Sequence, residues 1–209
     1  MSTATLIAPL QTITVESDPM PAASPAVATT APISLAGEIR RIVLTGFMGA
    51  GKTTVGRHLA ADLGWEFVDL DTLIEQRTGL TVPQIFAQQG EVAFRRIESH
   101  ALAVALGRKQ IVLALGGGAP ETLTNRLLLE QTPGTLNVYL HAPLDVLTAR
   151  CEAQQDGVER PVLADKDGLA RRFATRLTHY QRLAGVTIDT TSTNASDTTA
   201  LLRESIRQR

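Results

Sequence analysis

Residues 46–53 read GFMGAGKT, and this short stretch decides the fold. It matches the pattern G-x-x-x-x-G-K-[ST], and it lies between an apolar run at 41–45 and an amphipathic segment at 53–63. Glycines let backbone N–H groups curl around phosphate oxygens, and a helix N-terminus adds partial positive charge. Lys52 suits the β- and γ-phosphates, and Thr53 suits Mg²⁺. The stretch predicts a nucleotide-phosphate loop; a flexible glycine turn is the alternative interpretation.

Outward from this loop, short apolar runs alternate with longer amphipathic stretches, which is typical of a parallel sheet covered by helices. Helices are predicted at 53–63, where Val55, Leu59 and Leu63 share one face, and at 92–106. The predicted strands are 41–45, 66–69, 110–115, 135–140 and 186–189. We therefore predict a three-layer α/β fold, with a five-stranded parallel sheet, helices on both faces and right-handed crossovers.

The composition limits the possible partners. The 209 residues are 44% hydrophobic and 20% charged, with 20 basic against 21 acidic residues, as in one ordinary globular domain with an appendage. The balanced charge predicts no nucleic-acid partner, and no apolar run has the length of a membrane span. The single cysteine, Cys151, fits a reducing cytoplasm, so a cytoplasmic location is expected.

The N-terminal segment differs from the rest of the chain. Residues 1–36 are rich in Ala, Thr, Pro and Ser, and they have neither an apolar period nor the basic and apolar parts of a targeting signal. We predict a disordered extension at 1–36 and a P-loop domain at 37–209.

An acidic pair, Asp69 and Asp71, ends the second predicted strand. The predicted strand at 111–115 contains no aspartate for Mg²⁺, and strand ends in such sheets open onto the ligand crevice. Strand alternation would put both carboxylates on one side, so that Asp69 serves Mg²⁺, through water, while Asp71 reaches an acceptor hydroxyl. Alternatively, Asp71 only caps the helix that follows.

At this point the sequence resembles the shikimate kinases, a family of nucleoside-monophosphate-kinase-like P-loop enzymes. The resemblance covers 41 to about 189 and depends on six motifs in order. They are Gly49-Ala50-Gly51-Lys52-Thr53-Thr54, Asp69-x-Asp71, Phe94-Arg95-Arg96-Ile97-Glu98, Gly116-Gly117-Gly118, Arg160-Pro161-Val162-Leu163, and Arg176 four residues before Tyr180. It implies the strand order 2-3-1-4-5.

The resemblance also implies a role for each motif. The shikimate pocket would be lined by Asp71, Arg95, Gly116, Gly117, Gly118 and Arg176, and the two arginines would grip the carboxylate. ATP would contact Gly49, Ala50, Gly51, Lys52, Thr53, Thr54, Arg150 and Arg160. Arg160 would lie in a lid at about 152–166, and it would act in catalysis with Lys52 and Asp71.

Some of these roles have simpler alternatives, and the sequence differs from the family pattern at several positions. Arg95 could pair only with Glu91 or Glu98 on its own helix, and the glycine triplet could be a loose turn. Nine residues separate Arg150 from Arg160, which is more than in many relatives and predicts a longer lid. Thr178 or His179 stands where the family usually has a proline, and no arginine lies within 191–194.

The implied function is ATP-dependent phosphorylation of the shikimate 3-hydroxyl by a monomeric enzyme, a step of chorismate and aromatic amino-acid biosynthesis. The alternatives are a kinase for gluconate or a nucleoside monophosphate, and a non-catalytic ATP-binding module. Nucleotide kinases usually carry an Asp-Gly-Phe-Pro-Arg-type segment where this chain has Gly116–Gly118. A module without activity would have lost Lys52, Asp71 or an acceptor-site arginine, and all of these are present.

Overall fold

The computed structural model describes residues 39–153 and 165–208, which form one structural unit. The extension predicted at 1–36 lies outside the described residues. The same is true of Arg160 and of most of the lid predicted at 152–166. These predictions therefore rest on the sequence alone.

The described residues form a parallel sheet of five strands in the order β2-β3-β1-β4-β5, which confirms the predicted fold and strand order. The strands are β1 (Arg41–Thr45), β2 (Glu66–Asp69), β3 (Ile111–Ala114), β4 (Thr135–His141) and β5 (Val186–Asp189). The order reverses between β1, which pairs with β3, and β4, which pairs with β1 and β5. In open α/β sheets such a reversal opens a crevice at the carboxyl ends of the strands.

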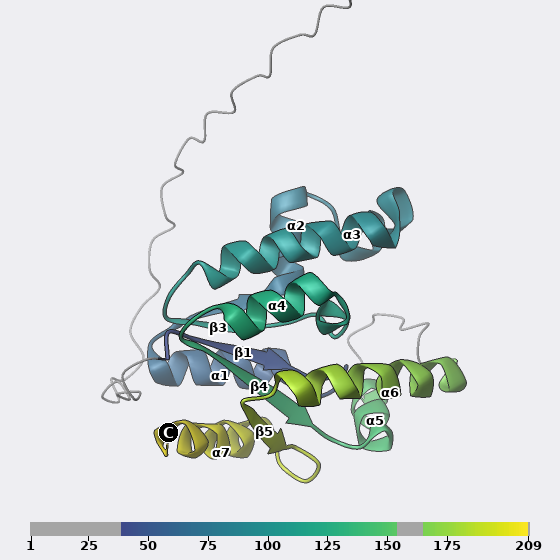
Figure 1. The fold of residues 1–209 in the computed structure, drawn as a ribbon. Helices are drawn as coiled ribbons and strands as arrows, with labels where there is room; N and C mark the ends of the chain where they lie inside the picture. The colour runs from purple at the N-terminus through teal and green to yellow at the C-terminus, as the bar shows by residue number, and fades with distance from the viewer. Residues whose placement is uncertain (1–38, 154–164, 209) are drawn as a thin grey trace, which may run out of the picture. The chain divides into compact units, whose positions relative to one another are not determined.

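Helices cover both faces of the sheet (Figure 1). On one face, Ile42 and Leu44 belong to a core cluster that also contains residues of α1 and α7. On the other face, Val43 and Leu113 belong to a cluster with residues of α2, α3 and α4, and Tyr139 stacks on Tyr180 of α6. The helices are α1 (Lys52–Leu63), α2 (Leu70–Thr78), α3 (Val82–Leu106), α4 (Leu123–Gln131), α5 (Leu144–Ala153), α6 (Lys166–Leu183) and α7 (Ala195–Arg207), with a short 3₁₀ turn η1 (Ala119–Glu121).

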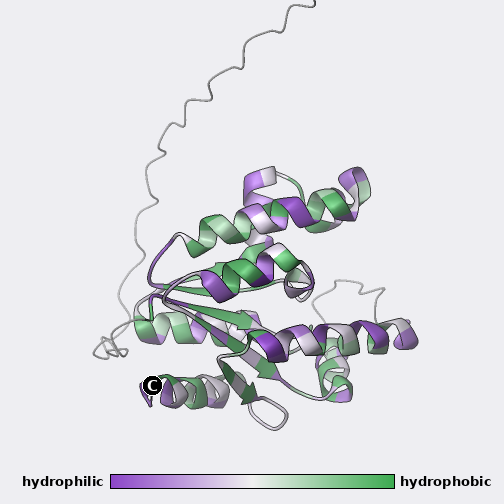
Figure 2. Cartoon of the chain, in the orientation of Figure 1, coloured by the Kyte–Doolittle hydropathy of each residue, from purple (hydrophilic) through white to green (hydrophobic). Residues whose placement is uncertain are grey.

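Hydrophobic burial explains why these segments fold as they do. The strands are the most apolar part of the unit, whereas the helices alternate apolar and polar residues (Figure 2). In α1 the predicted stripe of Val55, Leu59 and Leu63 is buried. The stripe fixes the rotation of α1 and therefore the direction in which its first turn faces.

Helix α3 begins ten residues before the predicted start at 92. Thr81 and Gln84 form a capping box that starts a first helical segment at Val82, and Gly90 then interrupts the helix with φ 78° and ψ 172°. The predicted segment at 92–106 corresponds to the part after this break. Its first two turns carry Arg95 toward the crevice.

Candidate active site

The loop between β1 and α1 closes tightly around its glycines. Gly49 has φ 76°, and a Cβ at this position would lie 2.4 Å from the carbonyl oxygen of Leu147. Only glycine fits there, because both the backbone angle and the space exclude a side chain. Gly51, the N-cap residue of α1, also has positive φ and has no side chain to occupy the free N–H groups of the first turn. The loop therefore presents backbone donors to an anion.

Lys52 lies inside this loop. Its Nζ donates hydrogen bonds to the carbonyl oxygens of Gly46, at 2.8 Å, and Phe47, at 3.1 Å. Removal of the ammonium group from water lowers the pKa of Lys52 to about 8, and the negative charges of Asp71 and Asp69 oppose this effect. A phosphate in the loop would favour the charged lysine, because it adds counter-charge to the part that Asp71 and Asp69 provide.

Asp69 connects the loop to α2. Its Oδ2 accepts a hydrogen bond of 3.1 Å from Thr53 Oγ1, while its Oδ1 accepts one of 3.1 Å from the backbone N–H of Asp71. Asp69 is thus the N-cap of α2, so the alternative in which Asp71 caps this helix is wrong. Strand alternation is also the wrong reason for the closeness of Asp69 and Asp71. The chain turns from β2 directly into α2 at Leu70, and this turn brings both carboxylates to one cavity.

Asp71 faces the glycine triplet. A Cβ at Gly116 would lie 2.9 Å from Asp71 Oδ1, so glycine is needed there to leave room for the carboxylate. Burial raises the pKa of Asp71, as does the charge of Asp69, while Lys52 acts in the opposite direction. A carboxylate with a raised pKa is a better proton acceptor for a nearby hydroxyl.

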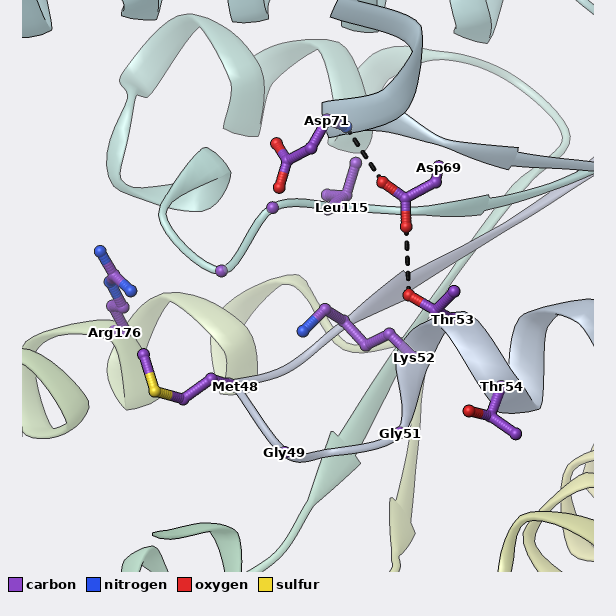
Figure 3. A pocket seen from close by; sticks show the side chains of 12 residues that line it. Met48, Gly49, Gly51, Lys52, Thr53, Thr54, Asp69, Asp71, Leu115 and Arg176 are labelled. Atoms are coloured by element: carbon purple, nitrogen blue, oxygen red, sulfur yellow. Dashed lines mark hydrogen bonds between the residues drawn. The ribbon is translucent and has the colours of Figure 1, made fainter. Parts of the chain in front are cut away.

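These groups share a cavity of about 400 Å³ (Figure 3). In the figure, Lys52 extends from the loop into the space between Asp71 and Arg176. The cavity is lined by Met48, Gly49, Gly51, Lys52, Thr53, Thr54, Asp69, Asp71, Leu115, Gly116, Gly117 and Arg176. The structure therefore brings the phosphate loop together with most of the residues predicted to bind the acceptor.

Arg95 and Arg176 approach the same triplet from α3 and α6. A Cβ at Gly118 would lie 2.8 Å from Arg95 Nη2, and a Cβ at Gly117 would lie 3.4 Å from Arg176 Nη1. Arg95 also pairs with Glu98 at 3.0 Å and Glu91 at 3.2 Å. The two interpretations of Arg95 are therefore compatible, since it has ion pairs on its own helix and also borders the triplet.

Two residues of this region carry contacts that the sequence did not predict. The carboxylate of Glu121 lies 3.0 Å from Arg176 Nη2 and 3.7 Å from Arg95 Nη2. The hydroxyl of Tyr180 donates a hydrogen bond of 2.6 Å to the carbonyl oxygen of Gly117 and so holds the triplet against α6. The spacing of Tyr180 from Arg176 was a usable signal for Tyr180. No local pattern connects Glu121 with an arginine 55 residues away.

A second cavity, of about 310 Å³, lies along the phosphate loop and shares Gly49, Gly51 and Thr54 with the first. Arg150 lines it and donates hydrogen bonds to the hydroxyl and carbonyl oxygens of Thr190. The other lining residues are Ala50, Val55, Ala153, Thr193, Asn194, Ala195 and Thr198. A guanidinium group beside small apolar side chains suits a planar base, so the loop lies between a base-sized cavity and a cavity lined by both acidic and basic side chains.

The donors around Thr53 fit Mg²⁺ in particular. This ion is usually held by one or two protein groups, with phosphates and water completing its shell. Thr53 Oγ1 and Asp69 Oδ2, 3.1 Å apart, provide such a partial shell next to the phosphate loop. Within 39–153 and 165–208, no cluster of three His, Cys, Asp or Glu side chains suggests a metal site built by the protein alone.

Comparisons with known proteins identify the family of this chain. The family model for shikimate kinase matches residues 48–207. The shikimate kinase of Moorella thermoacetica is 39% identical over 169 residues, covering 79% of this chain and 94% of that protein. That of Halorhodospira halophila is 41% identical over 170 residues, covering 80% and 93%. A solved shikimate kinase from Acinetobacter baumannii in complex with shikimate has a TM-score of 0.73 at 40% identity, covering 80% of this chain and 93% of that chain.

Proposed function

This chain belongs to the shikimate kinase family, and we propose that it transfers the γ-phosphoryl group of ATP to the 3-hydroxyl of shikimate. The observation that carries the proposal is the shared cavity, in which Lys52, Asp71 and Arg176 surround one space beside the phosphate loop. A cation for the phosphates, a proton acceptor and a carboxylate-binding guanidinium are the groups that this reaction requires.

The nucleotide would lie along the loop. Its base would occupy the cavity lined by Arg150, and its phosphates would accept hydrogen bonds from the first turn of α1. Lys52 would neutralise the charge that spreads over the transferring group. Mg²⁺, when bound at Thr53 and through water at Asp69, would supply further positive charge to the phosphates. We also propose that Arg160, which lies outside the described residues, approaches these phosphates.

Shikimate would lie on the glycine triplet, with its carboxylate between Arg95 and Arg176 and its 3-hydroxyl beside Asp71. The hydroxyl oxygen forms the new bond to phosphorus, the bond between phosphorus and the bridging β–γ oxygen breaks, and ADP leaves. Asp71 orients the hydroxyl and takes its proton, because burial raises the pKa of this carboxyl group while Lys52 favours the ionised form.

The expected partners are small molecules only. Among the residues that the structure describes, no helix is both long and apolar enough to cross a membrane. We also propose that the enzyme acts as a monomer in the cytoplasm, where reducing conditions suit the buried free thiol of Cys151.

A coupled assay of ADP release tests the proposal. The full chain is supplied with ATP and Mg²⁺, and shikimate is compared with gluconate, quinate and several nucleoside monophosphates. We expect rapid turnover with shikimate and little with the other acceptors. Failure of shikimate to stimulate ADP release would disprove the assigned reaction. Faster turnover with gluconate would favour a kinase for another polyol acid.

A further inference from the structure

Glu121 occupies the position between the two arginines that the substrate carboxylate requires. It is the last residue of η1, directly after the glycine triplet. Its Oε2 lies 3.0 Å from Arg176 Nη2 and 3.7 Å from Arg95 Nη2. A Cβ at Gly118 would lie 2.9 Å from the same oxygen, so the carboxylate rests directly above the triplet.

The charges in this cluster leave no surplus for a second carboxylate. Two guanidinium groups, of Arg95 and Arg176, face three carboxylates, of Glu91, Glu98 and Glu121, which gives a formal charge of −1. A substrate carboxylate that entered this arrangement would make the formal charge more negative, −2 in place of −1. Since like charges at close range in a partly buried site repel strongly, one glutamate must withdraw.

Glu121 is the glutamate that must withdraw, because it is the one of the three that pairs with both arginines. Glu98 is fixed, because only 2% of its side chain is exposed. Glu91 is 66% exposed and pairs with Arg95 from the solvent side, so it does not stand between the two arginines. The Glu121 side chain is 30% exposed, so it has a path to solvent. Its backbone is held, because Arg126 donates a hydrogen bond of 2.8 Å to its carbonyl oxygen. A change of side-chain rotamer is therefore enough to clear the site.

We propose that Glu121 is a specificity-determining residue that acts as an internal competitor for the arginine clamp. Its carboxylate pairs with both Arg95 and Arg176, and only an acceptor with its own carboxylate can replace it without leaving Arg176 without this ion pair. A neutral acceptor leaves Glu121 in place and gains nothing from the arginines. This inference rests on the proposed shikimate kinase function and adds to it the basis on which acceptors are selected.

Calorimetric titration of Glu121→Gln with shikimate and with its neutral methyl ester tests the inference. The amide keeps the shape of the side chain but removes its charge, and charge-assisted hydrogen bonds are roughly twice as strong as neutral ones. We expect the Kd for shikimate to fall about ten-fold, and the Kd for the ester to change less than about two-fold. In steady-state kinetics, KM for shikimate should fall by more than kcat changes. Glu121→Ala should shift both constants in the same direction.

Glu91→Gln is the matched control, because it removes a carboxylate that contacts Arg95 without lying between the two arginines. We expect it to change shikimate affinity less than about two-fold. Unchanged or weaker shikimate binding in both Glu121 variants would overturn the inference, as would an equal gain for the ester. Failure of the proposed function would look different, because the wild-type protein would then not phosphorylate shikimate at all.

Discussion

Thr53 Oγ1 donates a hydrogen bond of 3.1 Å to Asp69 Oδ2, so the residue after the loop lysine and the last residue of β2 place two oxygens side by side. The other oxygen of Asp69 caps α2. The same carboxylate thus serves both the fold and the proposed Mg²⁺ site, and a suitable substitution separates the two roles.

Asp69→Asn should weaken Mg²⁺ binding without unfolding the protein. Asparagine caps helices about as well as aspartate, so the melting temperature should change by less than about 2 °C. Loss of the negative charge should raise the Mg²⁺ concentration for half-maximal activity by about ten-fold. Asp69→Ala, which also removes the cap, should cost about 1 kcal/mol of stability in addition. An unchanged Mg²⁺ titration in Asp69→Asn would argue against this metal ligand.

ATP binding should depend on pH through Lys52. Burial lowers the pKa of Lys52 to about 8, so below that pH the lysine is already charged and binding needs no proton. Above it the lysine is neutral and must take up a proton to pair with the phosphates, so affinity should fall by up to about ten-fold per pH unit. Titration of an ATP analogue at pH 8.5 in buffers of different ionisation enthalpy should reveal this uptake. The Lys52→Met variant should bind the ATP analogue weakly and without proton uptake.

The lowered pKa of Lys52 should also make the stability of the protein depend on pH. The folded pKa of about 8 lies below the ordinary value of 10.5, so between these values the unfolded chain holds more protons than the folded one. The contribution of Lys52 to the free energy of unfolding should therefore rise with pH across this window. We would measure the free energy of unfolding by denaturant titration at several pH values in this window. Plotted against pH, it should rise more steeply for the wild type than for Lys52→Met. Parallel pH profiles would contradict a lowered pKa of Lys52.

Arg95→Lys and Arg176→Lys should each weaken shikimate binding. Lysine keeps the charge but loses the planar fork, and charge-assisted hydrogen bonds contribute about 1.5 to 3 kcal/mol each, so the Kd should rise about ten- to a hundred-fold. Affinity for an ATP analogue should be unaffected. Arg96→Lys is the matched control, since Arg96 is the exposed neighbour of Arg95 on α3 and should show less than about a two-fold change. Normal shikimate affinity in both test variants would refute the clamp.

Gly118→Ala should fold but bind shikimate poorly. Gly118 has φ −91° and ψ −8°, which alanine can adopt, so the backbone does not resist the change. The new Cβ would come within 2.8 Å of Arg95 Nη2, and this movable side chain would be displaced from the clamp. We expect KM for shikimate to rise about ten-fold, with a smaller change in KM for ATP. Gly107→Ala, at the other end of α3, controls for general effects of the substitution.

The sequence predicted the parts of the fold that depend on local patterns. All five strands were found, and three of these predictions, the runs at 41–45, 66–69 and 186–189, have the observed ends. The predicted start of β3 at 110 was one residue early, because Gln110 has φ 57° and cannot continue a strand. The start of α3 was missed because a capping box and a glycine break, rather than the apolar period, define that end.

Site residues could be predicted where one short motif sets their positions relative to one another. The phosphate loop fixes Lys52 and Thr53 relative to each other within a few residues. Glu121 could not be found in this way, because its contacts with Arg95 and Arg176 arise only when η1, α3 and α6 pack together. The sequence also did not predict that Asp69, and not Asp71, caps α2, because the capping residue depends on where the chain leaves β2.

The phosphate loop separates the two cavities, and Gly49, Gly51 and Thr54 line both of them. A single compound with an anionic ring at one end, a purine at the other and a phosphate chain along the loop would fill both cavities at once. Its second half would bind at the high effective concentration set by the tether. The thin wall that lets two substrates meet also makes this protein a target for bisubstrate inhibitors.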